Sequence, residues 1–325
     1  MPSISIVIPN YNMAGTIGIC LEAALASEYD DFEVIVVDDN SSDNSVDIIK
    51  EFPCRLICLY ENAGASKARN IGAQNSTGDI IFFTDADCLL QKDTLSAARR
   101  IISKEGDIVL GGTYTVEPFD KDFFSRFQSV SINYSETKNT ADPDYIATHA
   151  MAIHSRTFKE SNGFPEDFLP MLEDVEFSHR MKGAGKRLVM NPDIKVQHVF
   201  NFSFSRSLKN AFKKSRYWII YSLSNKDLTA DSGCASSELK FNVLSFFVTL
   251  LLLASWAVFQ QPLSLYLIPL TLTLNIALSR KLIMAFYREN GTVFAILSLL
   301  YWIVVYPVPV CAGGISGLIS ALLKK

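Results

Sequence analysis

Two pairs of acidic residues stand directly after apolar runs, where they could bind a cation and a charged ligand. Asp38 and Asp39 are adjacent, and Asp85 and Asp87 flank Ala86. Neighbouring carboxylates repel each other unless a cation or hydrogen-bond donors compensate. Oxygen ligands of this kind suit Mn²⁺ or Mg²⁺, and such an ion would neutralise a departing diphosphate as a Lewis acid. The alternative is a pair of polar strand ends, one aspartate of which caps the following segment.

The apolar runs before these carboxylates predict buried parallel strands. Runs such as VIVV and IIFF are almost continuously apolar, as a sheet covered on both faces requires. Predicted strands at 4–8, 32–37, 55–59 and 79–84 alternate with predicted helices at 16–26, 45–52, 66–75 and after residue 93. The alternation predicts an α/β, Rossmann-like domain with a mostly parallel, doubly wound sheet. Its ligand should bind beyond the carboxyl ends of the strands, where the acidic and amide residues gather.

Composition and missing motifs exclude several classes of protein. A net charge of -4 and a pI near 5.7 argue against nucleic acid as a partner. The sequence has no GxGxxG and no Walker A motif, which argues against a dinucleotide oxidoreductase or a P-loop enzyme. Its six cysteines show no zinc-ligand spacing.

Three stretches between residues 8 and 88 carry distinctive sequences in one order. They are IPNYN at 8–12, VVDDNSSDNS at 36–45 and ENAGASKARNIGAQNSTGDIIFFTDADC at 61–88. Together they resemble the signature of family 2 glycosyltransferases, whose catalytic domain has the GT-A fold. The resemblance implies a nucleotide-sugar donor, Mn²⁺ or Mg²⁺, and a set of donor and metal residues. In that set Pro9, Asn10, Tyr11 and Asp39 contact the nucleoside, Arg69 lies beside the base and phosphates, and Asp85 and Asp87 serve the ribose and the metal.

The same resemblance assigns the catalytic base of an inverting transfer to Asp174, next to Glu173 in MLEDVEFSHRMKGAGKRL. Asp174 would begin a helix that Glu176 and Arg180 stabilise at i, i+4 spacing. It could accept the proton of an acceptor hydroxyl as that oxygen attacks the sugar. The alternative is an acidic first turn favoured by the helix dipole. A lipid phosphate acceptor would need no base, because it is already nucleophilic.

Two further candidates lie between and beyond these motifs. His198, in VQHVF, closes another predicted strand, and in several GT-A enzymes a histidine near this place completes the metal shell. A lone histidine at a strand end is more often structural. Gly112, with Gly111 and Thr113, is expected to follow the fifth strand and to pass close to the sugar or acceptor, unless these glycines only make a turn.

The last part of the chain predicts contact with a membrane. Arg206, Lys209, Lys213 and Arg216 share one face of a predicted helix, which favours an amphipathic helix on an anionic membrane over a solvated one. Arg216 is a candidate for contact with a lipid acceptor. Residues 242–259 and 263–278 predict membrane helices, and 292–323 predicts one crossing plus a re-entrant or interfacial helix, because prolines and glycines interrupt it.

The predicted organisation is a glycosyltransferase domain at 1–204, an amphipathic helix and linker at 205–240, and a membrane region at 241–325. The first apolar run is too short for a signal peptide, and basic residues follow the second membrane helix. We therefore expect a multi-pass protein of the plasma (inner) membrane with a cytosolic catalytic domain.

The expected activity is transfer of a single sugar from a UDP- or GDP-sugar to a lipid, glycolipid or membrane-proximal acceptor in cell-envelope glycan synthesis. Processive synthases resemble this layout, but they carry QxxRW where this chain has KKSRYW at 213–218, without the glutamine and with the tryptophan shifted. A processive polysaccharide synthase and an inactive membrane scaffold of the same fold are the alternatives. The four aspartates Asp39, Asp85, Asp87 and Asp174 together argue against the inactive scaffold.

Overall fold

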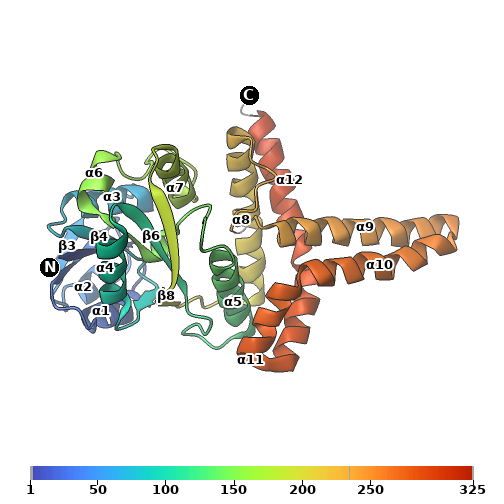
Figure 1. Cartoon of the computed structure of the whole chain (residues 1–325), viewed down its shortest axis with the longest axis horizontal. Coiled ribbons are helices and arrows are strands. Elements are labelled where there is room, and N and C mark those ends of the chain that lie inside the picture. Colours follow the sequence, from blue (N-terminus) through green and yellow to red (C-terminus); the bar gives the residue numbers. More distant parts are fainter. Residues whose placement is uncertain (1–2, 234, 324–325) are drawn as a thin grey trace. The chain divides into compact units, whose positions relative to one another are not determined.

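The computed structural model describes residues 3–233 and 235–323, which form two compact units. The first unit contains the chain up to Lys121 and Glu136–Asn201, and the second contains Asp122–Ser135 and the chain from Phe202 onward. The first unit is an α/β domain built on one mixed sheet, and the second is helical (Figure 1). The predicted fold class is confirmed, although antiparallel strands complete a sheet that begins as a parallel one.

The sheet has the strand order β3-β2-β1-β4-β7-β6-β8-β5. Its strands are β1 (Ile4–Asn10), β2 (Phe32–Asp38), β3 (Arg55–Cys58), β4 (Ile80–Phe83), β5 (Cys88–Leu90), β6 (Ile108–Tyr114), β7 (Met151–His154) and β8 (Arg187–His198). The helices of this unit are α1 (Ile17–Leu25), α2 (Ser45–Ile49), α3 (Ala65–Gln74), α4 (Thr94–Glu105), α6 (Ser155–Glu160) and α7 (Glu173–Gly183), with a short 3₁₀ turn, η1 (Thr148–Ala150).

The parallel strands β1, β2 and β4 bring the predicted ligand loops to one edge of the sheet. Asn10, the last residue of β1, is paired in register with Asp38, the last residue of β2, whereas Phe83, the last residue of β4, is paired with Val7. The three strands therefore end at the same edge of the sheet, with β4 ending three residues short of β1. All three strands are buried, as their apolar runs predicted. The segments that follow them, including Asp85, therefore leave the sheet at the same edge.

Gly112 lies inside β6, not after it, which corrects the position expected from the sequence. The pairing of β6 with β8 shifts register between Gly111 and Thr113. A Cβ atom on Gly112 would come within 2.5 Å of the main-chain oxygen of Ile194. Glycine is needed at this bulge because the two strands approach too closely for a side chain.

An aromatic cluster anchors helix α7 to the sheet. Phe164 contacts Phe83 of β4 with ring centroids 5.1 Å apart, and it contacts Phe177 of α7 at 4.8 Å. Phe158 completes the cluster, and all four rings are buried. This packing holds the first turn of α7, with Glu173 and Asp174, against the end of the sheet.

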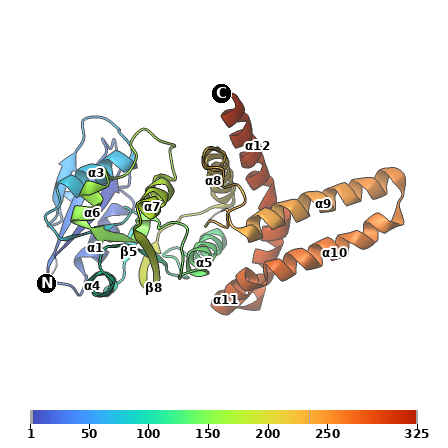
Figure 2. The ribbon, with the colours of Figure 1, turned by 45° about the horizontal axis from the view of Figure 1, so that its top comes forward.

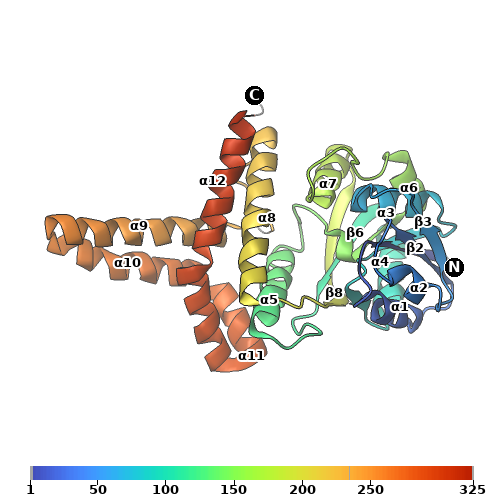
Figure 3. The ribbon, with the colours of Figure 1, turned by 180° about the vertical axis from the view of Figure 1, so that it is seen from behind.

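The second unit consists of long helices, seen from behind in Figure 3. They are α5 (Phe123–Thr137, whose last two residues belong to the first unit), α8 (Phe204–Asn225), α9 (Ser237–Phe259), α10 (Pro262–Leu278), α11 (Arg280–Leu300) and α12 (Pro307–Leu323), with a π-helical turn, η2 (Tyr301–Val305). Helices α9 and α10 form a hairpin (Figure 2). Ser237–Phe259 and Arg280–Leu323 are long and apolar enough to cross a membrane, and Pro262–Leu278 is apolar but shorter.

Gly313 does not interrupt the last helix, contrary to what the sequence suggested. It lies within α12 beside α8, where a Cβ atom would meet the carbonyl oxygen of Phe212 at 2.2 Å. A Cβ atom on Gly317 would likewise meet the carbonyl oxygen of Arg216 at 2.4 Å. The spacing of these glycines lets the two backbones touch, as small residues do in membrane helix pairs. The interruptions fall earlier, at Gly291 with its non-helical φ of 78° and at the π-helical turn.

Candidate active site

The two adjacent aspartates at the end of β2 have different roles: Asp38 stabilises the loop, and Asp39 faces the candidate ligand site. Asp38 accepts hydrogen bonds from Asn10 Nδ2 at 2.7 Å and from Ser41, so it holds the loop together. Asp39 accepts from the main-chain N–H groups of Ala63 and Gly64, at 2.7 and 2.8 Å. Each oxygen of the Asp39 carboxylate retains a second lone pair, because one amide occupies only one acceptor position. Asp39 is thus held rigidly and can still accept from a ligand.

Arg69 joins two carboxylates that are distant in the sequence. From helix α3, its Nη2 lies 2.6 Å from Asp85 Oδ1 and its Nη1 lies 2.7 Å from Glu173 Oε1. The Arg69 side chain is only 5% exposed. Burial opposes its charge, but Asp85 and Glu173 outweigh burial and raise its pKa. Burial would raise the pKa of Asp85, and Arg69 reverses this and lowers it, so both groups stay charged.

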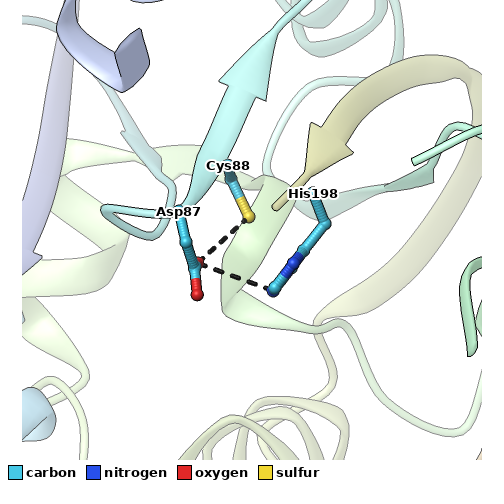
Figure 4. A group of neighbouring side chains, drawn as sticks. All are labelled: Asp87, Cys88 and His198. Carbon is cyan, nitrogen blue, oxygen red and sulfur yellow. Dashed lines mark hydrogen bonds and ion pairs between the residues drawn. The ribbon is translucent and has the colours of Figure 1, made fainter. Parts of the chain in front are cut away.

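Asp87, Cys88 and His198 form a cluster whose ligand atoms lie within 4.8 Å of one another (Figure 4). His198 Nε2 lies 3.5 Å from Asp87 Oδ1, because the register of β5 with β8 places Cys88 opposite His198. Burial, and then Asp85, raise the pKa of Asp87 to about 7. A divalent cation would compensate this repulsion and keep both carboxylates charged.

The residues present fit a hard divalent cation. Burial raises the pKa of the Cys88 thiol well above its usual range, so Cys88 stays protonated and is a poor ligand. The donor set is then a carboxylate oxygen of Asp87 and an imidazole nitrogen of His198. Carboxylate oxygens suit Mn²⁺ or Mg²⁺, and the cluster contains a single sulfur, the Cys88 thiol.

A cavity of about 410 Å³ brings together most of the residues selected from the sequence. Its volume falls within the range of about 300–1,000 Å³ found for ligand sites. The predicted residues that line it are Pro9, Asn10, Tyr11, Asp39, Arg69, Asp85, Asp87 and His198. It is also lined by Met13 and Ala86, and by Asn62, Gly64 and Ala65 of the loop after the third predicted strand, none of which was a predicted site residue. Asn62 and Gly64 follow β3, so their position after a predicted strand was the signal available.

Asp174 is the second residue of α7, and its neighbour Glu173 connects this helix to the cavity. Glu173 binds Arg69, which lines the cavity, while Asp174 itself is partly buried and is not among the lining residues. Burial, and then Glu173, raise the pKa of Asp174 to about 7. The residue before the pair, Leu172, has a φ of 76°, a left-handed conformation that is rare for leucine. Strain of this kind clusters at functional sites, where packing enforces it.

His149, a weaker metal-ligand candidate than His198 from the sequence, is buried and does not line the cavity. Its Nε2 lies 3.5 Å from Glu136 Oε2, and both side chains are 6% exposed. Burial opposes the charge of His149, but Glu136 outweighs it and raises the pKa of the imidazole. Tyr114 stacks on His149 at 4.0 Å and meets His198 edge-on at 4.9 Å. Tyr114 therefore packs between His149 and His198 and helps to fix the orientation of the His198 ring.

Gly112 and Arg216 do not line the cavity. Gly112 is packed against β8, and Arg216 belongs to α8 in the second unit, where its Nη2 donates to Ser320 Oγ at 3.3 Å.

Comparison with known proteins identifies the domain. Residues 5–161 match the model of Glycosyl transferase family 2, so the chain carries a family 2 glycosyltransferase domain. Glycosyltransferase GlyA of Streptococcus pneumoniae is 29% identical over 46% of this chain and 23% of its own length. The UDP-Glc:alpha-D-GlcNAc-diphosphoundecaprenol beta-1,3-glucosyltransferase WfaP of Escherichia coli is 39% identical over 27% of this chain and 36% of its own. The chain thus spans well under half the length of these relatives.

A solved structure supports the fold. The mannosyltransferase PcManGT of Pyrobaculum calidifontis, in complex with GDP-Man and Mn²⁺, superimposes with a TM-score of 0.61 and 16% identity, covering 100% of this chain and 88% of its own. The first unit is therefore a GT-A-like domain, and a helical region follows it in the chain.

Proposed function

We propose that this protein transfers a single sugar, with inversion, from a UDP- or GDP-linked donor to a lipid-linked or membrane-proximal acceptor. The observation that carries this is the bridge from Arg69 to Asp85 and Glu173. It ties the start of α7 to the cavity that Asp39 and Asp87 line.

The donor would bind with its nucleoside at Asp39 and its diphosphate near Asp87. Asp39 offers fixed acceptor oxygens to a ring N–H or to ribose hydroxyls, and Tyr11, which is 48% exposed, offers an aromatic face to the base. Arg69 places positive charge beside the diphosphate. Asp87 and His198 would hold Mn²⁺ or Mg²⁺, which supplies Lewis-acid neutralisation of the leaving group.

Asp174 would serve as the general base for a hydroxyl acceptor. A carboxylate with a pKa of about 7 is far more basic than an exposed one and is matched to neutral pH. The ion pair of Glu173 with Arg69 fixes the first turn of α7 and so positions Asp174. If the acceptor is a lipid phosphate, its own oxygen is the nucleophile and Asp174 has a positioning role.

The acceptor and the location in the cell are inferred from the helical unit. Ser237–Phe259 and Arg280–Leu323 have the length and apolarity of membrane spans, and the relative WfaP is named for a lipid diphosphate substrate. Arg280, Lys281 and Arg288 place positive charge after α10, the pattern of a cytosolic side. We therefore propose a multi-pass protein of the plasma (inner) membrane, with a cytosolic transferase domain at 1–204, an amphipathic segment at 205–240 and a membrane region at 241–325.

Release of the nucleotide tests the activity directly. The purified full chain with Mn²⁺ and a panel of nucleotide sugars should release UDP or GDP, and Asp87→Asn should stop the release. Asp93→Asn, an exposed aspartate at the start of α4, is the matched control. Mass analysis of the lipid product should show one added sugar. A chain of sugars would support a processive synthase, and the absence of nucleotide release in every donor would overturn the enzymatic proposal.

A further inference from the structure

His149 is tied to the segment that leads from β4 to Asp85. Phe83, the last residue of β4, pairs with Met151, the first residue of β7. Because the two strands are antiparallel, the residues after Phe83 run alongside those before Met151. Thr84 Oγ1 accordingly donates to the main-chain oxygen of His149 at 2.9 Å. This hydrogen bond fixes the main chain of His149 against the residue that precedes Asp85.

The His149 imidazole forms a buried ion pair with Glu136. Its Nε2 lies 3.5 Å from Glu136 Oε2, and each side chain is 6% exposed. Thr113 Oγ1 donates to the same glutamate oxygen at 2.7 Å, and the Tyr114 ring stacks on the imidazole. A glutamate is almost never fully buried unless it is paired, so this arrangement favours a cation at His149. Glu136, Thr113 and Tyr114 thus fix both the place and the charge of the imidazole.

The aspartates of the candidate active site act on this imidazole, and it acts on them. Burial opposes the charge of His149, but Glu136, Asp85 and Asp174 outweigh burial and raise the pKa of the imidazole. Burial raises the pKa of Asp85, whereas Arg69 and then His149 lower it. The described titratable groups around the imidazole are Glu136 of α5, Tyr114 of β6, Asp85 and Asp87 after β4, Asp174 of α7 and His198 of β8.

Asp174 depends on His149 because its other neighbouring cation is already engaged. Burial and then Glu173 raise the pKa of Asp174 to about 7, whereas Arg69 and His149 favour its charged form. The two terminal nitrogens of Arg69 bind Asp85 and Glu173. Charges in a buried site are screened little by salt, so the charge of the imidazolium still acts on Asp174 in solution.

We propose that Glu136 and His149 are positioning residues of the transfer reaction. Glu136 holds the His149 imidazole charged and in place, and this cation keeps Asp174 in the carboxylate form that accepts the acceptor's proton. The proton of the acceptor goes to Asp174, and the Glu136–His149 pair exchanges no proton with the substrate. The inference rests on the proposed function, in which Asp174 is the general base for a hydroxyl acceptor.

Donor hydrolysis by the full chain tests this role, with water as the hydroxyl acceptor. The donor is any nucleotide sugar that the wild type cleaves, and donor and Mn²⁺ are saturating for each variant. His149→Gln should reduce nucleotide release about three- to tenfold at pH 6 and much less at pH 9, because Asp174 without its neighbouring cation ionises at a higher pH. His154→Gln, at the end of β7, should retain the wild-type pH profile.

A double variant separates this role from a structural one. Glu136→Gln and His149→Gln should each lower the Tm by about 5–10 °C, because each leaves a buried partner unpaired. The two changes together should recover most of that loss, since no unpaired charge remains. The double variant should nevertheless keep the reduced release at pH 6. Recovery of the wild-type pH profile along with the Tm would show that the pair is only structural. Glu117→Gln, an exposed glutamate after β6, is the control for both measurements.

The charge of His149 also has a signature in thermal unfolding without any substrate. Because its pKa is raised, the associated stability is present below the pKa of histidine in the unfolded chain and is lost as pH rises through the folded value. Glu136→Gln removes the main partner, so its loss of Tm relative to wild type should be larger at pH 5.5 than at pH 9. An equal loss at both pH values would show that Glu136 does not hold His149 charged, and would overturn the proposal.

The outcomes distinguish this inference from the proposed function. If the wild type releases nucleotide and His149→Gln keeps the wild-type pH profile, the positioning role is wrong and the activity stands. If the wild type releases no nucleotide from any donor, the proposed function is overturned, and the role of the pair in transfer is overturned with it.

Discussion

Arg69 Nη1 lies 2.7 Å from Glu173 Oε1, joining residues 104 positions apart. The same guanidinium holds Asp85, so the fourth strand's acidic tip and the first turn of α7 share one cation. Breaking a buried ion pair by removing one partner is costly, because it leaves an uncompensated charge. The arrangement of the candidate active site therefore depends on a single buried side chain, that of Arg69.

Arg69→Lys should reduce nucleotide release about a hundredfold and destabilise the domain. A lysine ammonium is a point charge and cannot reproduce the forked contacts of a guanidinium to two carboxylates. Arg69→Ala should cost about 3–5 kcal/mol of unfolding free energy, measured by denaturant titration. Arg100→Lys, at an exposed position of α4, should change neither quantity. Wild-type turnover in Arg69→Lys would show that the bridge has no part in catalysis.

Asp174 should make both activity and stability depend on pH near 7. Its pKa is raised, so the folded state binds this proton more tightly than the unfolded chain does. The associated stability is present below the ordinary carboxyl pKa and is lost as pH rises through about 7. Transfer to a hydroxyl acceptor should increase over the same range, as the base form appears.

Asp174→Asn tests both effects. The amide imitates the neutral carboxyl group, so the variant should gain about 2–4 °C in Tm relative to wild type at pH 8, and little at pH 5. Transfer to a hydroxyl acceptor should fall about 10²–10⁴-fold. Asp167→Asn, an exposed aspartate upstream of α7, is the control for each measurement. An unchanged difference in Tm between pH 5 and pH 8 would contradict the assigned pKa.

His198→Ala should raise the Mn²⁺ concentration needed for half-maximal nucleotide release by at least about 10–100-fold. This is the loss typical when an outer-shell partner of a metal site is removed, and a direct ligand should matter no less. Chelation of the cation should abolish release in the wild type. His154→Ala, at the end of β7, should leave the metal requirement unchanged. Equal Mn²⁺ requirements for both variants would remove His198 from the metal site.

Gly313→Ala should destabilise the helical unit, while Gly314→Ala should be tolerated. A Cβ atom at 313 would collide with the carbonyl oxygen of Phe212 at 2.2 Å, whereas at 314 the nearest atom, Ser215 Oγ, is 3.5 Å away. Overpacking of this kind costs about 1–3 kcal/mol. Thermal unfolding in detergent distinguishes the variants, and equal Tm values would argue against close contact of α8 with α12.

Asn242→Leu should lower the stability of the same unit by about 1–2 kcal/mol. Asn242 Nδ2 donates to the carbonyl of Trp302 at 2.7 Å and its Oδ1 accepts from Asn275 at 2.8 Å. The Trp302 carbonyl lacks its usual helical partner, because Tyr306 N–H bonds Tyr301 and Pro307 has no N–H. Thr273→Leu, at an exposed position of α10, is the control in a thermal melt. A tolerated Asn242→Leu would show that this network is dispensable.

Local pattern was sufficient to predict the scaffold of the site. Apolar runs predict β1, β2 and β4, and a parallel arrangement of these strands predicts that Asn10, Asp39 and Asp85 lie at one edge of the sheet, as they do. These predictions succeed because strand burial and the direction of parallel strands follow from short stretches of sequence.

The sequence by itself determined the order of the elements, the family resemblance and the acidic tips of the strands. Only the tertiary structure decided that Arg69 binds Glu173, that Glu136 stands behind His149, and that Gly112 and Gly313 lie where backbones touch. It also placed Asp122–Ser135 with the helical unit. The physical reason is that helix and strand periods report which face of a segment is buried, but not which distant segment covers it.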